Sequence, residues 1–204
     1  MLPEPVDPPE VARLAPLASR AASELAYIRR TMERSAGFTA VPGWGSVGMG
    51  AIGLAATFIA RAQGTPSAWL AVWVTAAVVA FALGAVSLVR KAGRAGVSLS
   101  GHAARSFVRA LLPALAVGAL VTGVLWRTGS MELLPGVWLL LYGLGVTAAG
   151  AFSVPCVPIE GACLLAFGAL ALLFPGAADP WLLGLGFGLL QIGFGLYMAR
   201  RHGG

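Results

Sequence analysis

Residues 134–150 read LPGVWLLLYGLGVTAAG, and residues 181–198 read WLLGLGFGLLQIGFGLYM. These two segments bound a stretch, 134–199, that is almost uninterrupted apolar sequence. It contains two acids, Glu160 and Asp179, and no base before Arg200. A soluble domain can neither bury nor expose so much apolar sequence, so the stretch predicts several membrane spans.

The composition of the whole chain leads to the same class. Of the 204 residues, 58% are hydrophobic and 11% are charged, whereas soluble domains have roughly 45–50% apolar and about 25% charged residues. The length allows about six spans of roughly 20 residues each. We therefore expect an all-α polytopic membrane protein, a bundle of six transmembrane helices.

The expected spans are separated by connections of very different lengths. Three connections, 61–67, 127–135 and 175–180, are short enough to be tight turns, which predicts antiparallel neighbours. One long basic connection, 90–109, contains His102, which we expect to be a solvated loop residue. The spans are predicted at residues 44–60, 68–89, 110–126, 137–154, 159–174 and 181–198.

A segment of different character precedes the first span. Residues 17–36 show apolar positions at helical spacing with arginines and glutamates elsewhere, which predicts an amphipathic helix in a separate N-terminal cytoplasmic segment, 1–37, before the transmembrane domain, 38–204. Its apolar face includes Leu25, Ile28 and Met32. That face can dock a partner protein, or it can lie on the lipid headgroups.

The basic residues are distributed unevenly between the two ends of the expected spans. Arg61 and Arg127 are the only ones at one end, where their stems can snorkel. The excess of bases on the other side predicts that both termini are cytoplasmic, in the inner membrane of a bacterium. The bases of that side are Arg13, Arg20, Arg29, Arg30, Arg34, Arg90, Lys91, Arg94, Arg105, Arg109, Arg200 and Arg201. Because they flank apolar spans and form no soluble patch, we expect membrane lipids and not nucleic acid as their partners.

The first and fourth spans begin alike. PGW occurs at 42–44 and PGVW at 135–138, and at that offset Gly50 falls on Gly143. With three spans per half, such a repeat would be inverted, as in many transporters. The same residues also suit a turn with an interfacial aromatic anchor, so both interpretations stay open.

Polar side chains are rare within the spans. The start of the fifth span carries Glu160, where a helix N-terminus at the membrane interface favours an acid, and the last span carries Gln191. If a small solute binds within the membrane, these two side chains are the candidates for its polar site. Ser and Thr in the spans are expected to bond to their own helix carbonyls. The shortage of mid-span charges argues against ion-coupled transport.

Metal and cofactor chemistry has little support in the sequence. Cys156, Glu160 and Cys163 would share one face of a continuous helix, but Pro155 and Pro158 are expected to interrupt that helix. His102 and His202 cannot form a haem site across two spans. We therefore predict no metal, no cofactor and no catalytic residues.

The last span is rich in glycine, and Gly184 and Gly188 form a GxxxG pair. Small residues let two helices approach closely, so this face is expected to pack on another helix of the bundle or on a second protein. This face is a second candidate partner interface. The first is the apolar face with Leu25, Ile28 and Met32.

Several segments together resemble a known kind of protein. They are YIRRTME (27–33), FTAVPGWG (38–45), LPGVWLLLYG (134–143) and ARRHG (199–203). The chain resembles a family of six-span bacterial inner-membrane proteins, found in acidobacteria and similar lineages, that carries no assigned activity. The resemblance implies a sensory or accessory role and no transferable site residues.

Two functions follow from these observations. The first is a non-catalytic integral membrane protein that acts through protein contacts, as an accessory subunit, scaffold or membrane sensor, in a homo-oligomer or with a membrane protein partner. The alternative is a small transporter or channel for a neutral or lipidic solute. Neither requires the chain to be an enzyme.

Overall fold

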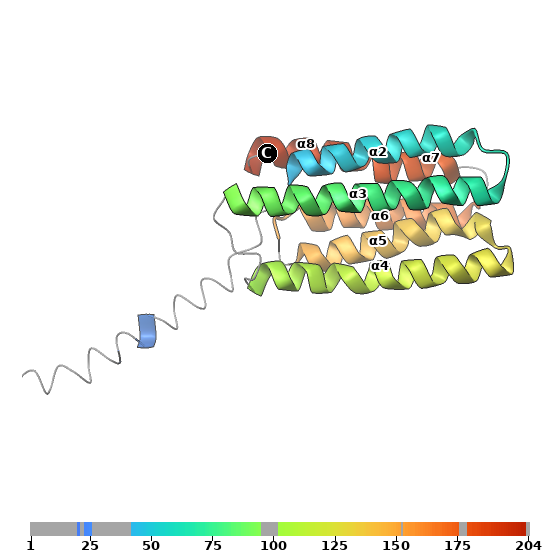
Figure 1. The fold of residues 1–204 in the computed structure, drawn as a ribbon. Helices are drawn as coiled ribbons and strands as arrows, with labels where there is room; N and C mark the ends of the chain where they lie inside the picture. Colours follow the sequence, from blue (N-terminus) through green and yellow to red (C-terminus); the bar gives the residue numbers. More distant parts are fainter. Residues whose placement is uncertain are drawn as a thin grey trace, which may run out of the picture. The chain divides into compact units, whose positions relative to one another are not determined.

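The protein is a bundle of long helices (Figure 1). The computed structural model describes residues 20, 23–25, 42–94, 102–151, 153–175 and 179–202. Contacts divide the chain into two units, Met1–Gly37 and Phe38–Gly204. In the first unit, Arg20 and residues 23–25 are helical and exposed. The rest of the predicted amphipathic helix, including Ile28 and Met32, lies outside the described residues.

Within the described residues of the second unit, six helices are long and apolar enough to cross a membrane. This confirms an all-α, multi-pass membrane protein. The last span has three parts, a short α-helix, a π-helix and a second α-helix. The elements are α2 (Gly43–Arg61), α3 (Pro66–Arg94), α4 (His102–Thr128), the 3₁₀ turn η1 (Met131–Leu133), α5 (Leu134–Gly150), α6 (Cys156–Leu173), α7 (Asp179–Leu183), the π-helix η2 (Gly184–Leu190) and α8 (Gln191–His202).

The expectation of a long loop at 90–109 is wrong for most of that segment. Helix α3 continues to Arg94, and α4 begins at His102. Arginine and lysine are good helix formers, so a helix need not end where its apolar run ends. The basic side chains are therefore carried on helical extensions of two spans, and His102 begins a helix.

The prediction that prolines interrupt the start of the fifth span is also wrong. Helix α6 begins at Cys156, with Pro155 as the residue before it and Pro158 in its first turn. The first backbone N–H groups of a helix have no intrahelical partner, so proline is tolerated there. The fourth span, in contrast, ends at Gly150, earlier than predicted.

Tight turns join neighbouring spans, as predicted, wherever the structure describes the connection. The link between α4 and η1 contains Gly129, whose φ of 76° lies in the left-handed region, which glycine adopts without steric cost. The link between α2 and α3 covers residues 62–65. Both turns place consecutive spans antiparallel, as Figure 1 shows for α4 and α5.

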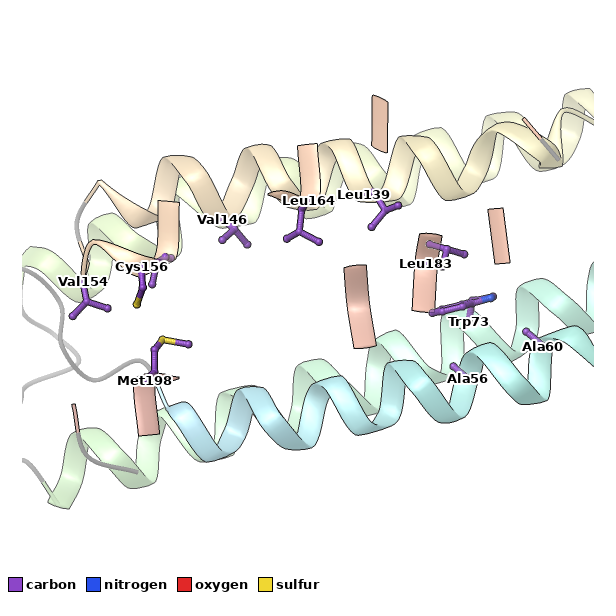
Figure 2. Packing of buried hydrophobic residues seen from close by; sticks show 11 residues of the cluster. Ala56, Ala60, Trp73, Leu139, Val146, Val154, Cys156, Leu164, Leu183 and Met198 are labelled. Carbon is purple, nitrogen blue, oxygen red and sulfur yellow. The ribbon is translucent and has the colours of Figure 1, made fainter. Parts of the chain in front are cut away.

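The helices form two groups of three, each around a central span. Helix α2 packs on α3 and on η2–α8, and α5 packs on α4 and α6. Figure 2 shows the core between helix layers, where Val146, Leu164 and Leu139 project toward Leu183 and Trp73. The outer faces of α3 and α4 are apolar and exposed, as with Val78 (64%) and Leu120 (69%), which is the arrangement expected where lipid covers a bundle.

Glycines allow the closest approach in each group. A Cβ placed on Gly50 of α2 would lie 2.7 Å from the carbonyl oxygen of Gly188, and one placed on Gly143 of α5 would lie 2.9 Å from that of Gly161. Any larger side chain would push these backbones apart. Small residues are used in this way where membrane helices touch backbone to backbone.

The same contacts explain why the first and fourth spans look alike. Gly50 and Gly143 are equivalent in the sequence comparison, and both lie in close helix contacts. Their partners differ, however, because Gly50 contacts η2 and the start of α8, whereas Gly143 contacts α6. A repeat of three consecutive spans would instead make α3 equivalent to α6. The two glycines therefore share a way of close packing but do not contact equivalent helices.

An aromatic cluster connects the two groups. The rings of Trp69 (α3) and Trp138 (α5) are stacked, with centroids 5.7 Å apart, and Trp73 lies beside Phe187 of η2 at 6.4 Å. The Trp138 indole Nε1 donates a hydrogen bond of 2.8 Å to the Thr122 hydroxyl of α4. These contacts fix α5 against helices of both groups.

Candidate functional site

The acid of the fifth span lies inside the bundle. Glu160 is 3% exposed, so its side chain faces protein, a point that the sequence left open. Its neighbour Gly161 brings α6 against Thr147 and Gly143 of α5. This close packing, which no sequence pattern specifies, draws the carboxyl group into the core.

The amide of the last span is buried as well. Gln191 is 6% exposed and is the first residue of α8, directly after the π-helix. The π-helix widens the backbone locally, a feature often found at functional sites. Its glycines Gly184 and Gly188 pack on Thr57 and Leu54 of α2, which holds this side of the span against the bundle.

Sequence reasoning missed a third member of the site, Tyr142 of α5. Its hydroxyl lies close enough to the side chains of Gln191 and Glu160 to interact with both electrostatically. The Tyr142 ring packs on Phe187, with centroids 5.4 Å apart. We call Tyr142, Glu160 and Gln191 the polar cluster. Three helices contribute to it, so only the tertiary fold brings it together.

The polar cluster differs from the other buried polar groups of the described chain. Ser46 and Thr57, which are also buried, donate to carbonyls of their own helix at 3.1 and 2.8 Å, as predicted. Glu160 Oε1 and Gln191 Oε1, in contrast, are buried without a hydrogen-bond partner. An unsatisfied buried acceptor costs about 1–3 kcal/mol. The cluster thus holds two acceptor oxygens that the protein itself does not satisfy.

A groove lies between α6 and the last span, and its lining does not include Tyr142, Glu160 or Gln191. Its volume is about 630 Å³, within the range of small-molecule sites. One wall comes from the start and the middle of α6, with Pro155, Cys156, Ile159 and Phe167. The other comes from η2 and α8, with Leu185, Leu189, Leu190, Gly193, Phe194 and Tyr197. We call this the α6–α8 groove.

The α6–α8 groove opens on the side of the bundle. Its lining side chains include Ile159 (57% exposed) and Leu189 (54% exposed), which lie on membrane-spanning helices. Helix α6 packs closely on α5 and touches η2 and α8 only sparingly. The opening therefore faces the place where lipid surrounds the spans.

The end of the groove near the C-terminus carries a positive charge. An adjoining hollow of about 380 Å³ is lined by Pro155, Cys156, Tyr197 and Arg201. The Arg201 guanidinium carbon lies 5.9 Å from the centroid of the Tyr197 ring, within cation–π range. A base therefore lies at the C-terminal end of the groove.

The two cysteines do not form a metal site with Glu160. Cys156 is buried and Cys163 half-buried, and both are free thiols. Among the described residues, no three His, Cys, Asp or Glu side chains gather as metal ligands. Cys156 belongs to the apolar core, where Figure 2 shows it facing Met198.

The structure describes the two predicted partner interfaces to different extents. Gly184 and Gly188 are buried against α2 of the same chain, so the in-chain alternative describes them and they offer no surface to a second protein. Leu25 is 66% exposed. Ile28 and Met32 lie outside the described residues.

The fold defines the chain as a multi-pass integral membrane protein with two buried polar side chains, Glu160 and Gln191, and a lateral groove. No protein-family model, curated protein or solved structure matches it. The resemblance to six-span bacterial inner-membrane proteins therefore stays a prediction, and the function has to be argued from the site.

Proposed function

We propose that the protein is a small non-catalytic transporter for a lipidic solute, which enters sideways from the bilayer through the α6–α8 groove. The observation that carries this proposal is the groove itself, an apolar hollow of about 630 Å³ that opens on the membrane-facing side of the bundle. A water-soluble solute would need an opening at an end of the bundle. An amphipathic one can slide between α6 and α8 from the lipid.

The polar cluster supports a transport function rather than a groove that bilayer lipid merely fills. Ile159 and Leu190 line the groove, and the adjacent residues Glu160 and Gln191 are buried with acceptor oxygens unpartnered. Polar groups within a membrane are costly and usually serve a function. A solute with a polar head and an apolar body would match both parts of this site.

The hypothesis that the protein acts through protein contacts is weaker than before, because the face with Gly184 and Gly188 packs on another helix of the same chain. It now depends on the apolar face of the N-terminal segment alone. We keep the α6–α8 groove as the basis of the proposed function because it needs no second protein to be complete.

The proposed location is the inner membrane of a bacterium, with both chain ends in the cytoplasm. The distribution of bases supports it, since Arg61 and Arg127 lie at the ends of α2 and α4 opposite to the end that carries Arg200 and Arg201. A C-terminal fusion to a reporter that works only in the cytoplasm should therefore show activity. Activity from a reporter that works only outside the cytoplasm would instead indicate the opposite orientation.

The transport proposal is tested with two tryptophan variants. A Cβ at Gly193 in the groove meets no atom within 4 Å, and the same is true of Gly123 on α4. Gly193→Trp therefore fills the groove without a backbone clash, and Gly123→Trp adds the same side chain elsewhere. Uptake of a fluorescent single-chain amphiphile into proteoliposomes should fall to the protein-free rate for Gly193→Trp and stay unchanged for Gly123→Trp. Equal uptake by the two variants would refute the proposal.

A further inference from the structure

We infer that Arg201 binds the anionic head group of a single-chain lipid whose apolar chain lies in the α6–α8 groove. This inference rests on the proposed function, because it names the class of solute that the groove admits. It is carried by the base that lies at one end of a groove with mainly apolar walls.

The hollow that contains Arg201 adjoins the groove. Pro155, Cys156 and Tyr197 line both of them. From these shared residues the groove continues along the last span as far as Leu185, whereas the hollow ends at Arg201. A ligand can therefore reach Arg201 with one end while the rest of it stays in the groove.

One face of the last span leads from the groove to this base. Leu190, Phe194, Tyr197 and Arg201 follow one another at intervals of four, three and four residues, which places them on the same side of a helix. The first three line the groove, and the last two line the hollow. The wall therefore changes from apolar to cationic at the end of the span.

The depth of this base in the membrane matches that of a lipid head group. Arg201 is the last residue of the span Trp181–Arg201, so it lies where the hydrocarbon core meets the polar head groups. The groove residues lie deeper. A lipid that moves sideways into the groove therefore brings its head group to Arg201. The volume of about 630 Å³ is that of a small-molecule site, which suits one chain better than two.

The Arg201 guanidinium keeps its hydrogen-bond donors for a ligand. The side chain is exposed, and its contact with the face of the Tyr197 ring uses no hydrogen-bond acceptor. Among the residues that the structure describes, none forms an ion pair or a side-chain hydrogen bond with it. Glu160, the acid of α6, lines neither the groove nor the hollow, so it does not take the place of an anionic ligand.

An anionic head group complements this end of the groove. A guanidinium has five donors and no acceptor, and its planar fork matches the oxygens of a phosphate or a carboxylate. An alcohol brings no charge, and an ammonium group would be repelled. Because Arg201 is exposed, water and salt screen the attraction. We therefore expect a preference of roughly fivefold, which corresponds to about 1 kcal/mol.

The experiment uses three photoreactive probes that share one alkyl chain with a diazirine in its middle. Their head groups are a phosphate, an alcohol and a primary amine. The full-length protein in nanodiscs of zwitterionic phospholipid is labelled with each probe at increasing concentrations, and the labelled peptides are identified by mass spectrometry. The phosphate should label α6 and α8 at roughly fivefold lower concentration than the alcohol, and the amine should need the highest concentration.

Two internal controls separate a site from general attraction to the protein. Helix α3 is exposed along the bundle and also ends in bases, Lys91 and Arg94, so its labelling measures how much of each probe surrounds the protein. The phosphate preference should be absent there. Unlabelled alkyl phosphate should displace the phosphate probe from α6 and α8, and the same amount of the two-chain lipid phosphatidylglycerol should not.

Variants assign the preference to one side chain. Arg201→Gln should bring the phosphate to the level of the alcohol, and Arg201→Lys, which keeps the charge, should retain part of the preference. Arg200→Gln is the matched control, because Arg200 is the preceding exposed base of α8 and lines neither the groove nor the hollow; it should change nothing. Gly193→Trp should abolish labelling of the groove by all three probes.

Each other result decides against one of the two statements. Equal labelling by phosphate and alcohol, a phosphate preference that survives Arg201→Gln, or equal displacement by phosphatidylglycerol would overturn the inference and leave the groove intact. A preference for the amine would overturn it as well. If no probe labels α6 and α8 of the wild type more than it labels those helices in Gly193→Trp, the proposed function itself fails.

Discussion

The substitution Gly143→Ala should destabilise the protein because it separates α5 from α6. A Cβ at this position would lie 2.9 Å from the Gly161 carbonyl oxygen and 2.9 Å from the Leu165 backbone nitrogen. Carbon–oxygen contacts between helices are normally about 3.3–3.6 Å. The two helices must therefore move apart by roughly 0.5 Å, because neither contact is the end of a flexible side chain.

The size of the effect follows from two opposing terms. Overpacking a well-packed contact costs about 1–3 kcal/mol, and a gap of roughly 0.5–1 Å forfeits a quarter to a half of each dispersion contact. Alanine also favours a helix interior over glycine by about 0.5–1 kcal/mol. The matched variant Gly123→Ala meets no atom within 4 Å and should show only this second, stabilising term.

The assay is thermal unfolding in detergent, followed by tryptophan fluorescence. The difference between Gly143→Ala and Gly123→Ala cancels the helix-propensity term and should equal the packing cost, about 1–3 kcal/mol. At about 2–4 °C per kcal/mol for a chain of this size, Gly143→Ala should unfold at the lower temperature by several degrees. If the two variants unfold together, the close contact between α5 and α6 does not exist.

Substitutions at three further positions test other contacts. Trp138→Phe keeps an aromatic ring in the cluster but loses the 2.8 Å hydrogen bond to Thr122, so the free energy of unfolding should fall by about 0.5–1.5 kcal/mol; an unchanged value in denaturant titrations would contradict this. Arg61→Ala removes a guanidinium whose central carbon lies 4.1 Å from the centroid of the Trp181 ring. The free energy of unfolding should fall by about 0.5–1 kcal/mol, and Arg61→Lys should restore part of that loss. Equal stability of the wild type and both variants would show that the contact contributes nothing. If the N-terminal segment docks a partner, Ile28→Glu should abolish co-purification from membranes without reducing the amount of protein there, and unchanged co-purification would end that hypothesis.

The class of the protein could be predicted from sequence because it depends on composition. The bilayer fixes the length of a span, and the runs of apolar residues mark six of them. Span ends were less predictable. The basic segments around Arg94 and Arg105 form helix outside the apolar runs, and Pro158 is accommodated in a first turn where no backbone hydrogen bond is lost.

The candidate site could be predicted only in part. Glu160 and Gln191 stand out because they are polar in apolar spans, and the structure places both next to Tyr142. Which face of each helix is buried could not be predicted, since α5 and α6 are apolar around their whole circumference. Tyr142 gave no signal because tyrosine is common at membrane interfaces, and its half-buried position beside Phe187 depends on how α5 packs in the bundle.

The arrangement of the helices could not be predicted either. Glycine spacing indicated that Gly184 and Gly188 approach another helix, but spacing alone cannot identify the helix. The choice of α2 depends on how all six spans fill the bundle. The α6–α8 groove exists because α6 uses its glycine face on α5 and leaves its other face only loosely packed.

The most direct test of the central claim is native mass spectrometry of the protein extracted gently from its own membrane. We expect a lipophilic small molecule to stay bound to the wild type and to Gly123→Trp and to be lost from Gly193→Trp. A wild-type protein that carries no such molecule, or that carries one equally in both variants, would contradict the claim that the α6–α8 groove is a binding site.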